Sequence, residues 1–214
     1  MNVAGCKETT LTIKAIVFDY GQVISLPQDP VTIDRLAERA GVERDKFGAM
    51  LWSLRGEWDR GTINGGEYYR EILSRLSVSV DDRTINDMVE MDLASWKNIN
   101  AGTVALAEEI KKAGYTLGIL SNMPHEFLNW ARKNNPVFPL FDMGLFSCEV
   151  NLLKPEKAIY EKLISLTGAE AGELVFFDDN HENVSSAREL GINAFLWKDP
   201  GSARRELLTL GLRL

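Results

Sequence analysis

Hydrophobic residues in this chain gather in short unbroken runs instead of alternating with polar residues. The clearest runs are Ile13–Phe18, Leu117–Leu120, Leu174–Phe177 and Ala194–Leu196, with a weaker one at Gly144–Ser147. Unbroken runs of this length are typical of parallel strands, which are covered on both faces of the sheet. The pattern therefore predicts a buried parallel sheet.

Helical patterns separate these strands in the second half of the chain. Apolar residues recur with helical spacing in Val104–Lys112, Pro155–Thr167 and Asn183–Leu190, and a glycine, which is a helix-stop signal, closely follows each segment. The proline that opens the second segment suits the first turn of a helix. This alternation predicts an α/β fold with a doubly wound parallel sheet.

The segment from residue 25 to residue 98 has helical periodicity and no convincing strand. Four helical patterns occur in it, at Ile33–Ala40, Lys46–Leu54, Gly66–Leu76 and Asp81–Trp96. We expect an inserted helical cap domain of residues 25–98, with residues 1–24 and 99–214 forming the core domain. The alternative is a few extra helices packed on one face of the sheet.

Composition restricts the class of partner. The chain has 214 residues, 45% of them apolar and 26% charged, which is ordinary for a soluble globular protein. Its longest apolar runs are far shorter than a membrane span, so we expect no membrane partner. The net charge of −7 argues against a nucleic-acid partner, which needs a basic surface. A small anionic substrate needs only a local positive pocket.

The two cysteines, Cys6 and Cys148, lie far apart in the sequence. We therefore expect neither a disulfide framework nor a cysteine-rich metal site. The segment Met1–Thr10 lacks the apolar core of a signal peptide, which favours a cytoplasmic location.

Polar residues stand at the ends of the first two predicted strands. Asp19 follows the first strand, and Ser121 and Asn122 close the second. Ligands of open α/β sheets bind at the carboxyl ends of the strands, where a serine hydroxyl and backbone N–H groups can hold a phosphate oxygen. The alternatives are an ordinary turn at Asp19 and a helix N-cap at Ser121 or Asn122.

Two further motifs supply charge. Lys154 directly precedes Pro155, so we expect its ammonium and the dipole of a helix starting there to favour an anion at one place; the alternative is a solvated lysine. Asp178 and Asp179 follow the most apolar strand and form a candidate Mg²⁺ site, unless they lie in an exposed loop. Together the four motifs supply a nucleophile, a hydroxyl, a cation and a metal site, which is the set that phosphoryl transfer requires.

The order of these motifs, FDYG, LSN, LKP and FFDDN, resembles that of the haloacid dehalogenase superfamily over nearly the whole chain. The first motif is similar to the FDxGxV branch, which includes bacterial glucose-1-phosphate phosphatase-like proteins. The phosphatase domain of soluble epoxide hydrolase is a related neighbour. The resemblance implies a Rossmann-like core with a helical cap after the first motif.

The resemblance also implies a role for each motif residue. Asp19 would be the nucleophile, Ser121 would bind a phosphoryl oxygen, and Asn122 would orient groups beside it. Lys154 would neutralise the phosphate and the Asp19 carboxylate. The metal ligands would be Asp19, the Gly21 carbonyl and Asp179, with Asp178 supporting the metal or Lys154. Asn183 would orient the acidic loop.

One departure from the family pattern concerns proton transfer. Many family phosphatases carry a second aspartate two residues after the nucleophile as general acid and base, and here that position is Gly21. Such help is worth about 10²–10⁴-fold in rate. The chain would then favour good leaving groups, such as sugar 1-phosphates or acyl phosphates, or another group would replace the aspartate. His125 is the nearest candidate in sequence, with a surface role as the alternative.

The expected function is a Mg²⁺-dependent phosphatase, a monomer or homodimer, acting on small phosphorylated metabolites through a phospho-aspartyl intermediate on Asp19. A 2-haloacid dehalogenase is the enzymatic alternative, although that chemistry has no phosphate or metal to justify the acidic pair. A non-catalytic binding protein on the same scaffold is the third hypothesis. The substrate would be selected by the cap, where Arg55, Trp58 and Arg60 are candidate pocket residues.

Overall fold

The structure is a computed structural model that describes residues 12–214. Cys6 and the segment Met1–Thr10, which carry the predictions on disulfides and signal peptides, lie outside the described residues. The fold is built on one sheet of five parallel strands in the order β3-β2-β1-β4-β5. These strands are β1 Ala15–Phe18, β2 Thr116–Ser121, β3 Met143–Phe146, β4 Leu174–Asp178 and β5 Asn193–Leu196. The predicted doubly wound parallel sheet is confirmed.

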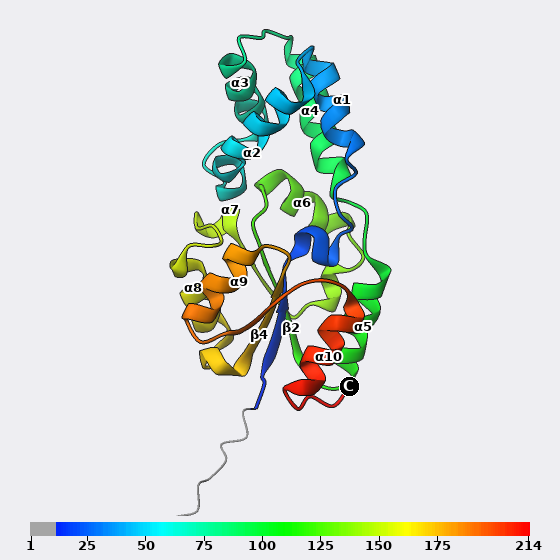
Figure 1. Ribbon diagram of the computed structural model, residues 1–214, viewed down its shortest axis with the longest axis vertical. Helices are drawn as coiled ribbons and strands as arrows, with labels where there is room; N and C mark the ends of the chain where they lie inside the picture. Colours follow the sequence, from blue (N-terminus) through cyan, green and yellow to red (C-terminus); the bar gives the residue numbers. More distant parts are fainter. Residues whose placement is uncertain (1–11) are drawn as a thin grey trace, which may run out of the picture.

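Strand β1 lies at the centre of the sheet and explains the unbroken apolar pattern. Its alternate residues Ile16 and Phe18 face one hydrophobic cluster, while Ala15 and Val17 face another. Helices α5 Ala101–Lys112, α6 His125–Asn134 and α10 Pro200–Thr209 contribute to the first cluster. Helices α8 Lys157–Thr167 and α9 His181–Glu189 contribute to the second (Figure 1). Both faces of the strand are therefore buried, which removes the need for polar positions.

The chain order of the strands reverses beside β1. From β1 the chain passes to β2 and β3 on one side, and later to β4 and β5 on the other. Phe18 pairs with Ile119 of β2 and with Phe177 of β4, so the carboxyl ends of these three strands lie at one edge. This reversal is the place where open α/β sheets bind ligands.

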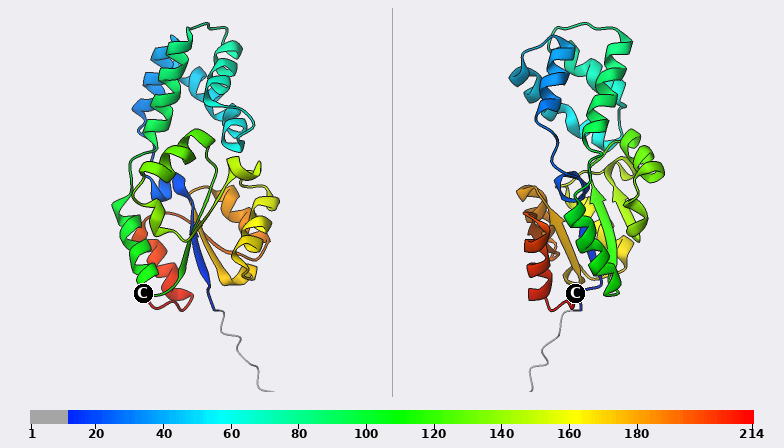
Figure 2. Two further views of the ribbon diagram at one scale, coloured as in Figure 1. Left: turned by 180° about the vertical axis from the view of Figure 1, so that it is seen from behind. Right: turned by 90° about the vertical axis from the view of Figure 1, so that its right-hand side faces the viewer.

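Four helices, α1 to α4, form the cap beyond that edge of the sheet (Figures 1 and 2). They are α1 Val31–Ala40, α2 Arg44–Arg60, α3 Gly65–Arg75 and α4 Asp82–Ser95. Their buried side chains form a hydrophobic cluster of their own, which includes the aromatic residues Phe47, Trp58, Tyr68 and Tyr69. The domain boundaries at residues 25 and 98 stay a prediction.

The two segments that join the cap to the core run side by side. Ser25 and Ile99 form an antiparallel bridge, and the amide N–H of Leu26 donates to the carbonyl of Asn98 over 2.8 Å. Pairing of the two connections restricts how the cap can move over the sheet edge.

Two sequence predictions about helices need correction. Pro155 does not open a helix: α8 begins at Lys157, with Glu156 as its N-cap. Helix α2 does not end at Leu54 but continues through Gly56 to Arg60, and it ends at Gly61 with φ 79°. The longer helix carries Arg55 and Asp59 to the core. Within residues 12–214, no helix is long and apolar enough to cross a membrane.

The remaining elements are short. They are a helical turn at Tyr20–Ile24, the one-turn helix α7 Ser147–Val150, and 3₁₀ turns at Phe138–Leu140 and Ala171–Glu173.

Candidate active site

Asp19 stands at the end of the central strand, where β1 turns into Tyr20–Ile24. Its Oδ1 accepts a hydrogen bond from the Tyr20 amide at 2.6 Å and lies 2.8 Å from Lys154 Nζ. The residue is 8% exposed, and it lines a cavity at the carboxyl edge of the sheet. The carboxylate is thus held on one oxygen and faces the cavity.

Lys154 is a buried ammonium between two carboxylates. Its Nζ lies 2.8 Å from Asp19 Oδ1 and 2.6 Å from Asp178 Oδ2, and it donates to the Leu120 carbonyl at 3.0 Å. Burial acts to lower the pKa of Lys154, but the two carboxylates more than offset this and raise it above its ordinary value. The solvated-lysine alternative is therefore wrong, and so is the helix-dipole argument, because α8 begins three residues later.

Asn122 fixes the loop that carries Lys154. Its Nδ2 donates to the Lys154 carbonyl at 3.0 Å, and its Oδ1 accepts from the Lys154 amide at 2.9 Å. Ser121, the last residue of β2, is buried, and its hydroxyl makes one long contact of 3.5 Å with the Asn122 carbonyl. That hydroxyl is available to an oxygen atom placed in the cavity.

Asp178 and Asp179 project beside Asp19 from the end of β4. The three residues can each offer one carboxylate oxygen within 4.8 Å of the others. Asp178 is fully buried and accepts hydrogen bonds from Asn183 Nδ2 at 2.9 Å and from the Asn180 amide at 2.8 Å. Asn183 thus lies where an orienting residue of the acidic loop would lie.

The electrostatics of the cluster favour a bound cation. Burial raises the pKa of Asp19 to about 7, Lys154 opposes this rise, and Asp178 and Asp179 add to it. Burial and Asp178 also raise the pKa of Asp179. Three carboxylates face one ammonium, so negative charge is in excess. Hard carboxylate oxygens are the donors that Mg²⁺ prefers, and the set fits that ion.

A cavity of about 210 Å³ joins this site to the cap. The core contributes Asp19, Tyr20, Gly21, Gln22, Ser121, Asn122, Met123, Pro124, Phe127, Asp179, Asn180 and Asn183. The cap and its connection contribute Trp52, Arg55, Asp59 and Trp96. The sheet edge supplies the candidate catalytic and metal-binding groups, and the cap closes the opposite side of the cavity with aromatic and charged side chains.

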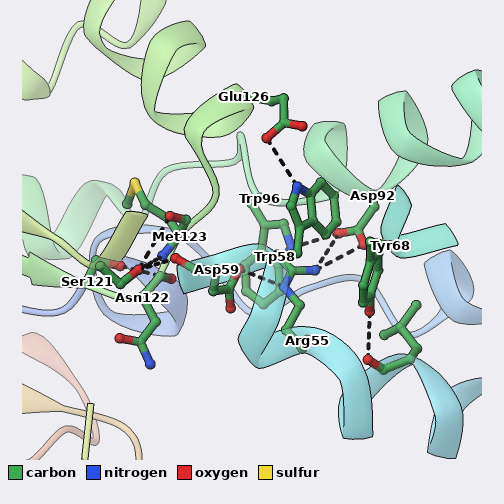
Figure 3. A network of polar contacts seen from close by, with 12 residues as sticks. Arg55, Trp58, Asp59, Tyr68, Asp92, Trp96, Ser121, Asn122, Met123 and Glu126 are labelled. Atoms are coloured by element: carbon green, nitrogen blue, oxygen red, sulfur yellow. Dashed lines mark hydrogen bonds and ion pairs between the residues drawn. The ribbon is translucent and has the colours of Figure 1, made fainter. Parts of the chain in front are cut away.

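Of the three cap residues expected in the pocket, only Arg55 lines the cavity. Trp58 is fully buried, stacks on Tyr68 at 4.8 Å between ring centroids, and donates to Glu126 Oε2 at 3.1 Å (Figure 3). Arg60 pairs with Glu156. The prediction that Trp58 and Arg60 line the pocket is therefore wrong. Trp58 packs within the cap, and both residues bond the cap to the core.

His125 is exposed and does not line the cavity, which agrees with the surface alternative. Two site residues escaped the sequence reasoning. Gln22, with φ 57°, donates from Nε2 to Asp179 Oδ2 at 2.6 Å. Asp59 faces the cavity one turn after Arg55, and that spacing would have indicated it had α2 been predicted to its full length.

A fold and site of this kind define a haloacid dehalogenase-type hydrolase. The model of the haloacid dehalogenase-like hydrolase family matches residues 13–191, and the chain belongs to that family. The narrower resemblance to the FDxGxV branch stays a prediction.

Relatives in this family differ in their named activities. Bifunctional epoxide hydrolase 2 of Sus scrofa is 32% identical over 92% of this chain, which spans only 38% of that protein's length. Phosphatase MT3486 of Mycobacterium tuberculosis is 25% identical, with 94% of this chain and 96% of that protein covered. (S)-2-haloacid dehalogenase 4A of Burkholderia cepacia is 23% identical, with coverages of 85% and 81%.

A solved structure supports the fold independently. The family enzyme bt-2542 of Bacteroides thetaiotaomicron, in complex with magnesium and inorganic phosphate, superposes with a TM-score of 0.66. It is 23% identical, and the match covers 87% of this chain and 95% of that one.

Proposed function

We propose that this chain is a Mg²⁺-dependent phosphatase that hydrolyses small phosphorylated metabolites through a phospho-aspartyl intermediate on Asp19. The observation that carries the proposal is the position of Lys154. A buried ammonium that bridges Asp19 and Asp178 favours the ionised, nucleophilic form of Asp19 against the effect of burial, and it can neutralise a phosphoryl group beside it. The magnesium in the bt-2542 complex, together with the fit of the three carboxylates, supports Mg²⁺ as the cofactor.

Each site residue then has a part in phosphoryl transfer. Tyr20 N–H and Lys154 hold Asp19 Oδ1, which leaves Oδ2 to attack phosphorus. The Ser121 hydroxyl and Lys154 bind phosphoryl oxygens, and Asn122 keeps the Lys154 loop in place. Asp19, Asp179 and the Gly21 carbonyl would hold Mg²⁺, with Asp178 supporting Lys154 and the metal. When bound, the ion supplies positive charge to the phosphoryl oxygens.

The dehalogenase alternative explains the charges less well. Displacement of halide by an aspartate requires no metal, so it gives no reason for Asp178 and Asp179 to stand beside Asp19 in a buried site. Phosphatase chemistry accounts for all three carboxylates and for Lys154.

The test is turnover of p-nitrophenyl phosphate with Mg²⁺ by the wild type and by Asp19→Asn. We expect turnover only in the wild type, with acid-stable covalent phosphate absent from the variant. Turnover of 2-chloropropionate in EDTA, without phosphatase activity, would favour the dehalogenase. A folded wild type that binds phosphate and turns over neither substrate would favour a binding protein.

A further inference from the structure

Among the core residues that the structure describes, no carboxylate of this site is free to protonate a leaving group. The position that could hold one is Gly21, and the nearby carboxylates Asp178 and Asp179 are occupied by Lys154, Asn183 and Gln22. An in-line displacement by Asp19 places the departing oxygen on the far side of phosphorus. Asp19 lies at the sheet edge and the cap lies across the cavity, so the departing oxygen must face the cap.

We propose that Asp59, on the last turn of α2, is the general acid and base of the reaction and acts from the cap on the leaving group and then on water. This inference rests on the proposed phosphatase function. Asp59 lines the cavity that Asp19 also lines, and the residue is 8% exposed. Its Oδ1 accepts a hydrogen bond from Arg55 Nε at 2.9 Å. Its Oδ2 has no hydrogen-bond donor among residues 12–214.

The core holds the backbone of Asp59 directly. Ser147 Oγ donates to the Asp59 carbonyl, and the same Oγ accepts from the Met123 amide at 3.0 Å (Figure 3). Met123 follows Ser121 and Asn122, so two hydrogen bonds through Ser147 connect the carboxyl end of β2 to the backbone of Asp59. A Cβ at Gly61 would lie 2.8 Å from the Cys148 carbonyl, which shows how closely the end of α2 packs on α7. A carboxylate held in this way is positioned before the substrate arrives.

Arg55 is already neutralised and does not act as the cavity's anion receptor. Its Nη1 donates to both oxygens of Asp92, at 3.1 and 3.0 Å. Asp92 is fully buried and also accepts from Tyr69 Oη at 2.8 Å and Trp96 Nε1 at 3.2 Å. Asp92 is thus saturated by donors, whereas Asp59 shares the same arginine and keeps one oxygen free for a ligand.

The surroundings of Asp59 favour its protonated form more than water does. Burial raises the pKa of Asp59 above that of an ordinary carboxyl group, and Asp92 of α4 adds to the rise. Arg55 of α2 and Lys154 of the core oppose it. A carboxyl group with a raised pKa holds its proton closer to the working pH, as a general acid must.

The steps balance for a phosphate monoester. Asp19 Oδ2 forms a bond to phosphorus while the bond from phosphorus to the ester oxygen breaks, and protonated Asp59 gives its proton to that oxygen, which releases an alcohol. Water then attacks the phosphorus of phospho-Asp19, and Asp59 takes one of its protons. The products are hydrogen phosphate and free Asp19, with Asp59 protonated again.

The alternative role for Asp59 is purely to position Arg55. Asp59→Asn separates the two roles when it is compared with the wild type on phosphate monoesters of increasing leaving-group pKa. We expect kcat/KM for alkyl phosphates to fall by about 10²–10⁴-fold, whereas p-nitrophenyl phosphate should still release p-nitrophenol in a burst. Phospho-Asp19 should accumulate after the burst, because its hydrolysis has lost its base.

The matched control is Glu57→Gln, which changes an exposed carboxylate two residues away on the same helix. It should leave the dependence on leaving-group pKa as it is in the wild type. A second variant, Gly21→Asp in the Asp59→Asn background, should restore much of the lost alkyl phosphatase activity. A residue that merely positions Arg55 could not be replaced by a carboxylate on the opposite wall.

Two results would overturn the inference. One is an equal loss by Asp59→Asn on all leaving groups, without restoration by Gly21→Asp. The other is an unchanged dependence on leaving-group pKa. If Asp59→Asn does not fold, two other variants decide the question. Asp59→Glu, which keeps the carboxyl group, should keep alkyl phosphate turnover. Gly21→Asp/Asp59→Ala should hydrolyse alkyl phosphates faster than Asp59→Ala, and no gain would contradict the inference. Failure of the phosphatase proposal is distinct, because the wild type would then not turn over p-nitrophenyl phosphate.

Discussion

The ammonium of Lys154 lies 2.8 Å from Asp19 Oδ1, although Asp19 follows β1 and Lys154 lies between α7 and α8, more than a hundred positions later. The same ammonium contacts Asp178, and it lies over the ring of Phe176, with Nζ 5.4 Å from the ring centroid. One lysine therefore neutralises part of the charge at the ends of both β1 and β4. Its removal leaves the buried carboxylates of Asp19 and Asp178 without the cation that balances their charge.

Replacement of Lys154 by methionine, which keeps the volume of the stem, should abolish turnover. Breaking a buried ion pair by removal of one partner typically costs about 3–5 kcal/mol, so a large fall in Tm should accompany the loss. Mg²⁺ should restore part of the Tm, because it supplies positive charge to the same carboxylates. The matched control is Lys157→Met, an exposed lysine paired with Glu189. A kinetic effect below about tenfold for Lys154→Met would contradict the role given to this residue.

Chelation should abolish the activity and lower the stability of the wild type. An ion that binds only the folded chain raises Tm, and the rise grows with the logarithm of the ion concentration once that exceeds Kd. Titration of Mg²⁺ into the EDTA-treated protein should therefore raise Tm, and Asp179→Asn should weaken that response. Asp179 is half-buried and pairs with Gln22, so this substitution should leave the fold intact. Full turnover in EDTA would reject the metal-dependent phosphatase.

In the metal-free protein, the stability of Asp19→Asn relative to the wild type should increase as pH rises. The folded-state pKa of Asp19 is about 7, chiefly through burial, against 3.8 in the unfolded chain. Between these values the folded chain holds more protons than the unfolded chain, so stability falls as pH rises and then levels off above pH 7. Asparagine does not titrate and avoids that loss.

Calorimetry in EDTA across this pH range checks the prediction. The Tm difference between Asp19→Asn and wild type should grow from about pH 4 to about pH 7 and then stay constant. A difference that does not change with pH would show that Asp19 ionises normally in the metal-free site. Excess Mg²⁺ should reduce the difference, because the ion favours the ionised carboxylate.

The sheet and its edge were predictable from sequence because each depends on local patterns. Unbroken apolar runs must be buried on both faces, and parallel strands bring Asp19, Ser121 and Asp178 to one edge whatever the loops do. The sequence placed Asn122 beside the phosphate site, but it did not predict the two hydrogen bonds between the Asn122 side chain and the Lys154 backbone. That contact depends on the path of a loop between distant elements.

The cap side of the cavity was much less predictable. Trp58 and Arg55 are three residues apart on one helix, yet one is core and the other lines the cavity. Which face of α2 meets the core depends on where the helix ends, at Gly61, and on the hydrogen bond from Ser147 to the Asp59 carbonyl. Neither feature is visible in the hydrophobic pattern. Asp59 was missed for the same reason.

Gly21→Asp should fold without strain. Gly21 has φ −61° and ψ 129°, which any L-residue adopts, and an added Cβ would meet Trp96 Cζ3 at an ordinary 3.7 Å. A new carboxylate there would stand beside the leaving group from the core side. If no other group protonated the leaving group, alkyl phosphate turnover would rise by about 10²–10⁴-fold. With Asp59 already in that role, we expect a gain below about tenfold.

A comparison between leaving groups distinguishes proton donation by the new carboxylate from a general effect of the substitution. Any strain, or any new contact with Trp96, should change kcat for all substrates alike, whereas a useful proton donor should help most where the departing alkoxide is most basic. The slope of log kcat against leaving-group pKa in Gly21→Asp and wild type therefore isolates proton donation. Nearly equal slopes in a folded, Mg²⁺-binding variant agree with a donor already present in the cap. A markedly shallower slope in Gly21→Asp would mean that the wild type lacks such a donor, and Asp59 would then have only a structural role.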